Sequence, residues 1–308
     1  MAAYTGTGQK GGKEMERTGM GKLVMQMAVT IALLGGICAW NLHRADERVA
    51  AMLEQGGVQL PVIMYHSILK DEARAGPYVL SPAALEADLD YLQHNGYETV
   101  TISELVDFVD GKGDLPAKPV LITFDDGFYN NYLYAYPLLA ERDMQAVVSV
   151  IGEQTALYTE SGQENAYWSY LSAGRLVEMQ ESGVFEIGNH SYDLHDDSVR
   201  KGCLKKRSES VEEYRQMLTD DTHLSQTYLA ESGLTPPQCY AYPYGAYSDE
   251  TEDILKAMGF RCTLTCEERI NIISPGDPDS LFLLGRYNRP SGMSTTTFFE
   301  KALPGEGS

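Results

Sequence analysis

The stretch PVLITFDDG, residues 119–127, decides the fold of this chain. Its first six residues are mostly apolar and end at a turn, a pattern typical of a strand buried on both faces. Asp125 and Asp126 follow at once, and Gly127 allows the backbone to turn. Since successive strand side chains point to opposite faces, adjacent carboxylates can line one site only where the strand ends. In parallel α/β folds that edge carries the active site, so we expect one here; the alternative is a solvated acidic turn.

Outward from this stretch, short apolar strands alternate with amphipathic helices from residue 60 onward. Such alternation predicts an α/β fold with a parallel sheet, and about seven strands suit a distorted (β/α)7-type barrel. One helix is expected after Ser81-Pro82, because serine caps a first turn and proline fits its first position. The strands are expected at 61–66, 119–124, 146–151, 185–188, 239–242, 260–265 and 281–287, and the helices near 82–94, 129–142, 172–182, 207–232 and 248–258.

A second motif, IGNHSYDLH at 187–195, places polar residues after another predicted strand. Two imidazoles five residues apart on a loop, His190 and His195, can hold one metal together with a carboxylate. Such a set leaves positions open for water and substrate, as a catalytic metal requires. A lone histidine is usually structural, but two in one strand-end loop favour a metal site.

Two weaker motifs also follow predicted strands. In AYPYG, residues 241–245, proline fixes a turn and the N–H of Tyr244 could face a developing oxyanion; a packed aromatic turn is the alternative. In MYHSI, residues 64–68, His66 stands at the end of the first strand. Tyr167, Trp168 and Tyr170 could stack on sugar rings, but we expect them to pack in the core.

The N-terminal segment predicts a membrane anchor. Residues 23–40 carry no charge and, as a helix, would extend ~27 Å, enough to span a bilayer. Basic residues precede them, which places the N-terminus in the cytoplasm. We therefore expect a cytoplasmic tail over 1–22, a single-pass cell-membrane anchor over 23–40, a stalk over 41–58 and an extracytoplasmic domain over 59–308. A cleaved secretory signal is the alternative, but no small-residue cleavage site ends the apolar run.

The charge balance limits the partners. The whole chain has a formal net charge of −20, although residues 1–44 hold five Lys/Arg and only two Asp/Glu. The remainder is thus strongly acidic, which argues against binding nucleic acid or another anionic polymer and favours a neutral substrate.

The cysteines after the predicted anchor do not have the spacing of a structural zinc site. Cys262 and Cys266 could form a disulfide, but buried thiols are an equally good interpretation. The four cysteines whose state stays open are Cys203, Cys239, Cys262 and Cys266.

The ordered motifs TFDDG, GNHSYDLH and AYPYG resemble those of the polysaccharide deacetylases of carbohydrate esterase family 4, the NodB-homology fold. The resemblance covers roughly residues 60–303. It implies a metal-dependent hydrolase in which Asp125 is the catalytic base, and the ligands are Asp126, His190 and His195. Zn²⁺ suits these ligands, although Co²⁺, Ni²⁺ or Fe²⁺ also fit.

Two departures from the usual family pattern point to one branch. The histidines are five rather than four residues apart, and Ala241 stands where most members have arginine. Both features resemble the enzymes that deacetylate poly-N-acetylglucosamine outside the cell. This likeness implies His66 as the general acid and Arg286, in LLGRYN, as the residue that orients the base.

The expected function is removal of N-acetyl groups from the N-acetylglucosamine units of a cell-surface or cell-wall polysaccharide. The related alternatives are an O-acetyl xylan esterase and a catalytically silent glycan-binding member. A phosphatase of the haloacid-dehalogenase type is a further alternative, but its chemistry needs two aspartates separated by one residue. In this chain the two aspartates, Asp125 and Asp126, are adjacent.

Overall fold

The computed structural model describes residues 11–304, with only some of the side chains in 11–48, and divides the chain into two units. The first unit is Met1–Glu54 and the second is Gln55–Ser308. The boundary lies close to the predicted junction between stalk and catalytic domain.

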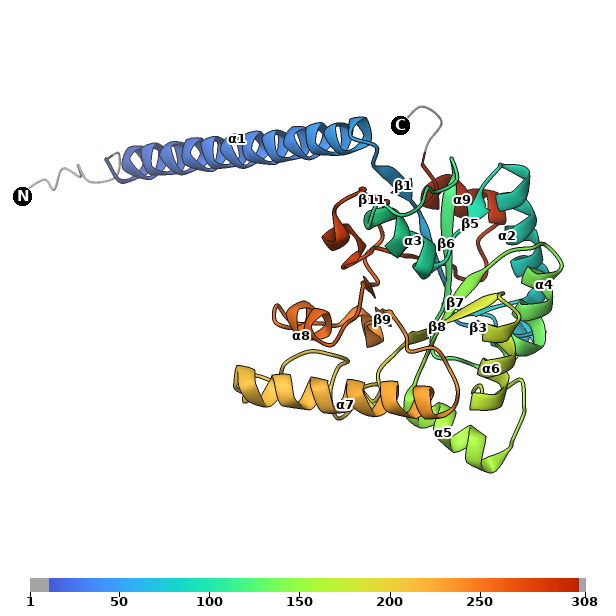
Figure 1. The fold of residues 1–308 in the computed structure, drawn as a ribbon. Coiled ribbons are helices and arrows are strands. Elements are labelled where there is room, and N and C mark those ends of the chain that lie inside the picture. Colours follow the sequence, from blue (N-terminus) through green and yellow to red (C-terminus); the bar gives the residue numbers. More distant parts are fainter. Residues whose placement is uncertain (1–10, 305–308) are drawn as a thin grey trace, which may run out of the picture. The chain divides into compact units, whose positions relative to one another are not determined.

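The first unit consists of one continuous helix, α1 (Gly11–Glu54), which is 44 residues long (Figure 1). It contains the predicted anchor over 23–40 and most of the predicted stalk; residues 1–10 of the predicted tail lie outside the described residues. Within the described part of the chain, no helix has both the length and the apolar character needed to cross a membrane. The helix predicted over 23–40 is present within α1.

The second unit is built on a curled parallel sheet, whose strands β6 and β7 lie among its helices in the right half of Figure 1. Seven strands follow one another in the order β10-β9-β8-β7-β6-β2-β12, and β5 (Glu98–Thr99) pairs with β6 off this path. All neighbours in the path are parallel, as the alternation of strands and helices predicts. The seven strands are β2 (Val62–Tyr65), β6 (Pro119–Phe124), β7 (Ala146–Val150), β8 (Phe185–Asn189), β9 (Cys239–Ala241), β10 (Cys262–Leu264) and β12 (Tyr287–Asn288).

One strand prediction is wrong. Most of the predicted strand over 281–287 is absent: Leu281 ends a short 3-10 helix, Pro278–Leu281, Leu283 has φ 57°, and Leu284 forms only an isolated parallel bridge with Leu264. A positive φ interrupts strand geometry, so only Tyr287 and Asn288 remain to pair with β2.

Both faces of the sheet are buried, as the apolar run in PVLITF predicts. Ile122 lies on one face of the sheet and packs there with residues of α2, α4 and α6. Leu121, one position earlier, packs in a second cluster on the opposite face with residues of α3, β9 and β10. This alternation follows from the two-residue period of strand side chains.

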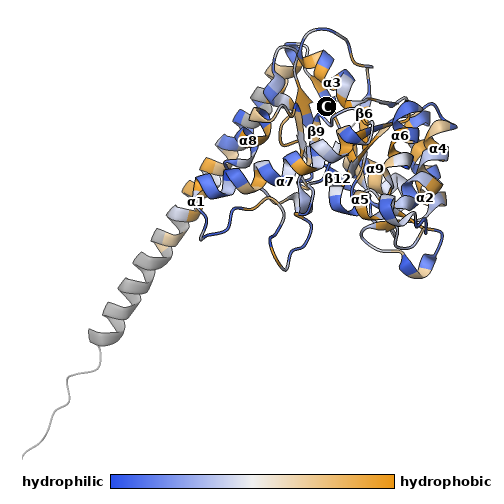
Figure 2. Ribbon diagram, turned by 60° about the horizontal axis from the view of Figure 1, so that its bottom comes forward, coloured by the Kyte–Doolittle hydropathy of each residue, from blue (hydrophilic) through white to orange (hydrophobic). Residues whose placement is uncertain are grey.

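The helices surround the sheet and mix hydrophilic with hydrophobic residues, as one-sided burial requires (Figure 2). Ser81 caps α2 as predicted, accepting a hydrogen bond from the backbone N–H of Ala84. The predicted helix over 129–142 instead divides into a π-helical turn, Asn131–Ala135, and the short α4. The helices are α2 (Pro82–His94), α3 (Ile102–Val109), α4 (Tyr136–Ala140), α5 (Gly152–Ser161), α6 (Ala173–Glu181), α7 (Val211–Glu231), α8 (Thr251–Ala257) and α9 (Thr295–Ala302).

Two small sheets complete the unit. The antiparallel pair of β1 (Val58–Leu60) and β11 (Asn271–Ile273) joins the beginning of the unit to a late segment. The parallel pair of β3 (Ser67–Ile68) and β4 (Val79–Leu80) follows His66 directly. It therefore restrains the loop that carries this histidine.

Candidate active site

The carboxyl ends of four strands, β2, β6, β8 and β9, bring the predicted site residues to one edge of the sheet. Asp125 directly follows β6, and its backbone N–H donates to Tyr65 O, 3.0 Å away, at the end of β2. His190 directly follows β8, and β9 leads into Tyr244. Because these strands are parallel and in register, residues far apart in the sequence meet here.

Asp126, His190 and His195 converge, with one potential ligand atom from each lying within 4.8 Å of the others. Asp126 Oδ1 is 3.5 Å from His190 Nε2 and 3.2 Å from His195 Nε2. The Nδ1 of His190 contacts Ala241 O at 2.8 Å, which turns Nε2 towards the carboxylate. Asp126 Oδ1 is buried and has no hydrogen-bond partner among the described residues. A His₂Asp set with an unsatisfied carboxylate oxygen fits a divalent cation.

The electrostatics of this cluster favour an ionised carboxylate. Burial raises the pKa of Asp126, but the adjacent imidazoles of His190 and His195 outweigh it and hold the pKa far below its usual range. Burial lowers the pKa of His195, but the Asp126 carboxylate raises it by more, so this pKa lies above the ordinary value of a histidine. The Asp126 carboxylate is therefore ionised at neutral pH, which favours a cation at this position.

Asp125 forms a buried ion pair with Arg286. The guanidinium donates to Oδ1 and Oδ2 of Asp125, each at 2.7 Å, and its Nε donates to Thr265 O at 2.8 Å. Burial raises the pKa of Asp125, but the charge of Arg286, followed by that of His190, lowers it to below the normal value. The structure thus places Arg286 where the family resemblance predicts it, on the proposed base.

His66 lines the same pocket as Asp125 and Asp126, with its ring 4.8 Å from that of Tyr78. Its Nδ1 is buried and has no hydrogen-bond partner among the described residues. Burial lowers the pKa of His66, although the carboxylates of Asp125 and Asp126 oppose this effect. The imidazole is consequently neutral at pH 7 before substrate binds.

Two asparagines that the sequence analysis did not single out hold the His66 loop. Asn131 donates to His66 O at 2.7 Å, and Asn130 accepts from the backbone N–H of Ile68 at 2.9 Å. Asn130 also donates to Ser67 Oγ at 2.9 Å. The only signal in the sequence is the pair of amides in FYNNY, directly after TFDDG.

Tyr244 adopts φ 58° and sits beside a ligand histidine. Its hydroxyl donates to His195 O at 2.8 Å, and the two rings lie 4.5 Å apart. Gly245 follows with φ 62°, and a Cβ there would lie 2.9 Å from Cys266 N, so the turn requires glycine. The side chain of Tyr244 therefore positions His195, while the role of its N–H stays a prediction.

The site opens into a pocket of about 780 Å³ that also contains exposed aromatic residues. Tyr78 and Tyr167 line it and are 58% and 46% exposed; Trp168, next to Tyr167, is 57% exposed. The expected core packing of these aromatics is wrong for Tyr167 and Trp168. The prediction of core packing agrees better with Tyr170, whose ring stacks on that of Phe128.

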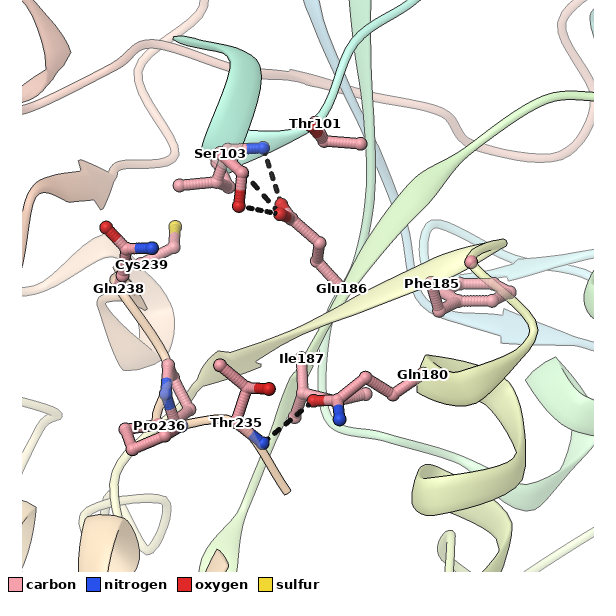
Figure 3. A pocket seen from close by; sticks show the side chains of 13 residues that line it. Thr101, Ser103, Gln180, Phe185, Glu186, Ile187, Thr235, Pro236, Gln238 and Cys239 are labelled. Carbon is pink, nitrogen blue, oxygen red and sulfur yellow. Dashed lines mark hydrogen bonds between the residues drawn. The ribbon is translucent and has the colours of Figure 1, made fainter. Parts of the chain in front are cut away.

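A second pocket, of about 300 Å³, lies at the start of β8 and β9, away from the strand ends that carry the site (Figure 3). There the Glu186 carboxylate accepts from the backbone N–H groups of Ile102 and Ser103 and so caps α3. None of the predicted site residues lines this pocket.

The cysteines are free thiols throughout the described part of the chain. Cys203, Cys239 and Cys262 are buried, while Cys266 is exposed and lines the active-site pocket. The structure thus favours thiols over a bond between Cys262 and Cys266.

Comparisons with known proteins agree with this geometry. The family model "Polysaccharide deacetylase" matches residues 112–263. The structure of IcaB from Ammonifex degensii is 31% identical with a TM-score of 0.62, over 76% of this chain and 93% of that one. A de-N-acetylase from Aggregatibacter actinomycetemcomitans has the same fold, with 24% identity and a TM-score of 0.66 over 79% of this chain and 99% of that one.

A curated relative is the poly-beta-1,6-N-acetyl-D-glucosamine N-deacetylase of Staphylococcus aureus, 28% identical over 204 residues. The alignment covers 66% of this chain and 65% of the relative, slightly less than two thirds of its length. The motifs, the parallel half-barrel and these matches together define the class of protein. The chain belongs to the polysaccharide deacetylase family.

Proposed function

We propose that this protein is a metal-dependent N-deacetylase that removes acetyl groups from the N-acetylglucosamine residues of a cell-surface or cell-wall polysaccharide. One observation carries the proposal: the donor atoms of Asp126, His190 and His195 lie within 4.8 Å of one another beside the buried pair of Asp125 and Arg286. The IcaB structure and the S. aureus relative support the choice of substrate.

The cation would be held by Asp126, His190 and His195. Two imidazoles and one carboxylate suit Zn²⁺, and Co²⁺, Ni²⁺ and Fe²⁺ accept the same ligands. When bound, such a metal polarises the amide carbonyl and lowers the pKa of water.

The chain's own residues supply the proton transfers. Asp125, kept ionised by Arg286, accepts a proton from the water that attacks the acetyl carbon. The N–H of Tyr244 donates to the oxyanion that develops on the carbonyl oxygen. His66 takes up a proton from solvent and donates it to the amine nitrogen as the carbon–nitrogen bond breaks, which leaves acetate and a glucosamine residue. The lowered pKa of His66 makes its protonated form a stronger acid.

The test is acetate release from β-1,6-linked N-acetylglucosamine oligomers by the metal-loaded protein. We expect activity that a chelator abolishes and that Asp125→Asn loses. Full activity in His190→Ala would refute the metal site. Acetate release from O-acetylated xylan alone would assign an esterase, and glycan binding by the metal-loaded protein without acetate release would assign a silent member.

We further propose that the deacetylase unit acts outside the cytoplasm, attached to the cell membrane through its N-terminal segment. The uncharged stretch 23–40 and the basic residues before it support this location. Fractionation of cells and protease treatment of intact cells test it. Recovery of the full chain in the cytosolic fraction would contradict it.

A further inference from the structure

The loop between the two histidine ligands needs external support. His190 and His195 must present their rings to one point, yet Ser191 between them has φ 70°, a conformation that residues other than glycine rarely adopt. Such backbone persists only where its surroundings hold it.

Two elements hold this loop. The first turn of α5 donates from the backbone N–H groups of Gly152 and Glu153 to Ser191 O and Tyr192 O, each at 3.0 Å. From the other side, one carboxylate of α7 accepts from two successive N–H groups: Asp221 Oδ1 from Tyr192 at 2.9 Å and Oδ2 from Asp193 at 2.8 Å. The loop is therefore fixed through both its carbonyl and its N–H groups.

The Tyr192 side chain is packed equally closely. A Cβ built on Gly152 would lie 2.7 Å from the Tyr192 ring and 3.2 Å from Ser225 Oγ of α7. Only glycine leaves room for this approach, so α5, α7 and the ligand loop meet at one point.

Asp221 has no cation to compensate its charge. No ion pair of Asp221 occurs in the part of the chain that the structure describes, and the neighbouring charge that acts on its pKa is the carboxylate of Asp193. Burial and that neighbouring charge raise the pKa of Asp221 to about 6, although the two N–H groups oppose the shift. Glu153, also with a raised pKa, lies against Asp193 from α5.

We propose that Asp221 is a positioning residue of the metal site, whose carboxylate holds the loop between His190 and His195 in the conformation that presents both imidazoles to one cation. The inference rests on the proposed metal-dependent function. It adds a residue 26 or more positions away from either histidine, on a helix that contributes no ligand.

The test measures metal binding rather than turnover. The metal-free full chain is titrated with Co²⁺ against a competing chelator at pH 7.5, and the visible absorption of the bound Co²⁺ is recorded. Asp221→Ala is expected to weaken binding about 10–100-fold, the usual effect of losing an outer-shell partner, and to change the spectrum. Asp221→Asn keeps one acceptor oxygen and is expected to lose less. The matched control is Asp220→Ala on the same helix, whose exposed carboxylate bonds only Gln216 among the described residues.

Wild-type affinity and an unchanged spectrum in Asp221→Ala would overturn the inference. If that variant does not fold, Asp221→Asn decides on the same two readouts. Failure of the unmodified protein to bind Co²⁺ would instead remove the metal site, and with it the proposed function. The two failures are thus distinguishable.

Discussion

Replacing Arg286 by methionine tests the base and its environment together. Methionine keeps an unbranched side chain but removes the charge and both donors to Asp125. The guanidinium is completely buried and Asp125 is only 2% exposed, so water cannot replace the lost partner without local opening. Removing one partner of a buried ion pair costs about 3–5 kcal/mol.

For a domain of this size, about 2–4 °C of melting temperature is lost per kcal/mol, so Arg286→Met should melt roughly 10 °C lower. The same change alters the titration of the base. Without Arg286, the largest effect that opposes burial is lost, and the pKa of Asp125 rises. Because the base must be ionised, the acid limb of kcat/KM should move to higher pH, with a loss of about 10²–10⁴-fold where Asp125 is protonated.

The assays are thermal unfolding of the metal-free protein and acetate release between pH 5 and 9. Arg215→Met is the control, since Arg215 is exposed on α7 and its loss should change stability by no more than about 0.5 kcal/mol. Wild-type stability and an unmoved acid limb in Arg286→Met would refute the role assigned to this ion pair.

Three further outcomes are expected. Asp125→Asn should lose acetate release by about 10²–10⁴-fold yet keep its metal; loss of metal as well, measured by elemental analysis, would argue against separate roles for base and ligands. Metal retention at equilibrium dialysis should fall as the pH drops through the raised pKa of His195, because protonated imidazole cannot bind a cation; retention independent of pH would contradict this. As the pH rises from 4 to 7, the metal-free wild type should lose about 2–3 kcal/mol of unfolding free energy relative to Asp221→Asn, because the pKa of Asp221 is about 6 in the folded state and 3.8 ordinarily. Urea unfolding at each pH measures this difference. Parallel pH curves for the two proteins would refute the raised pKa of Asp221.

The sequence determined the class of fold and the cluster of potential metal ligands, because both depend on short-range patterns. The run PVLITF identifies a doubly buried strand, and the polar residues after it must lie at the strand's carboxyl end. His190 and His195 occupy one loop, so their spacing indicates that both imidazoles could bind the same cation. Because the strands are parallel, their carboxyl ends lie at one edge of the sheet, and Asp126 is therefore expected at the same edge as the two histidines.

The tertiary structure decided which distant side chains support that site. Arg286 reaches Asp125 across 161 positions, and Asn131 reaches His66 across 65. Asp221 lies on a long polar helix with several similar acidic residues, and nothing in their local pattern marks one as a loop anchor. Short-range motifs are visible in sequence because one backbone segment holds all their groups. Contacts between elements depend on which strands and helices become neighbours, and only the packed core sets that arrangement.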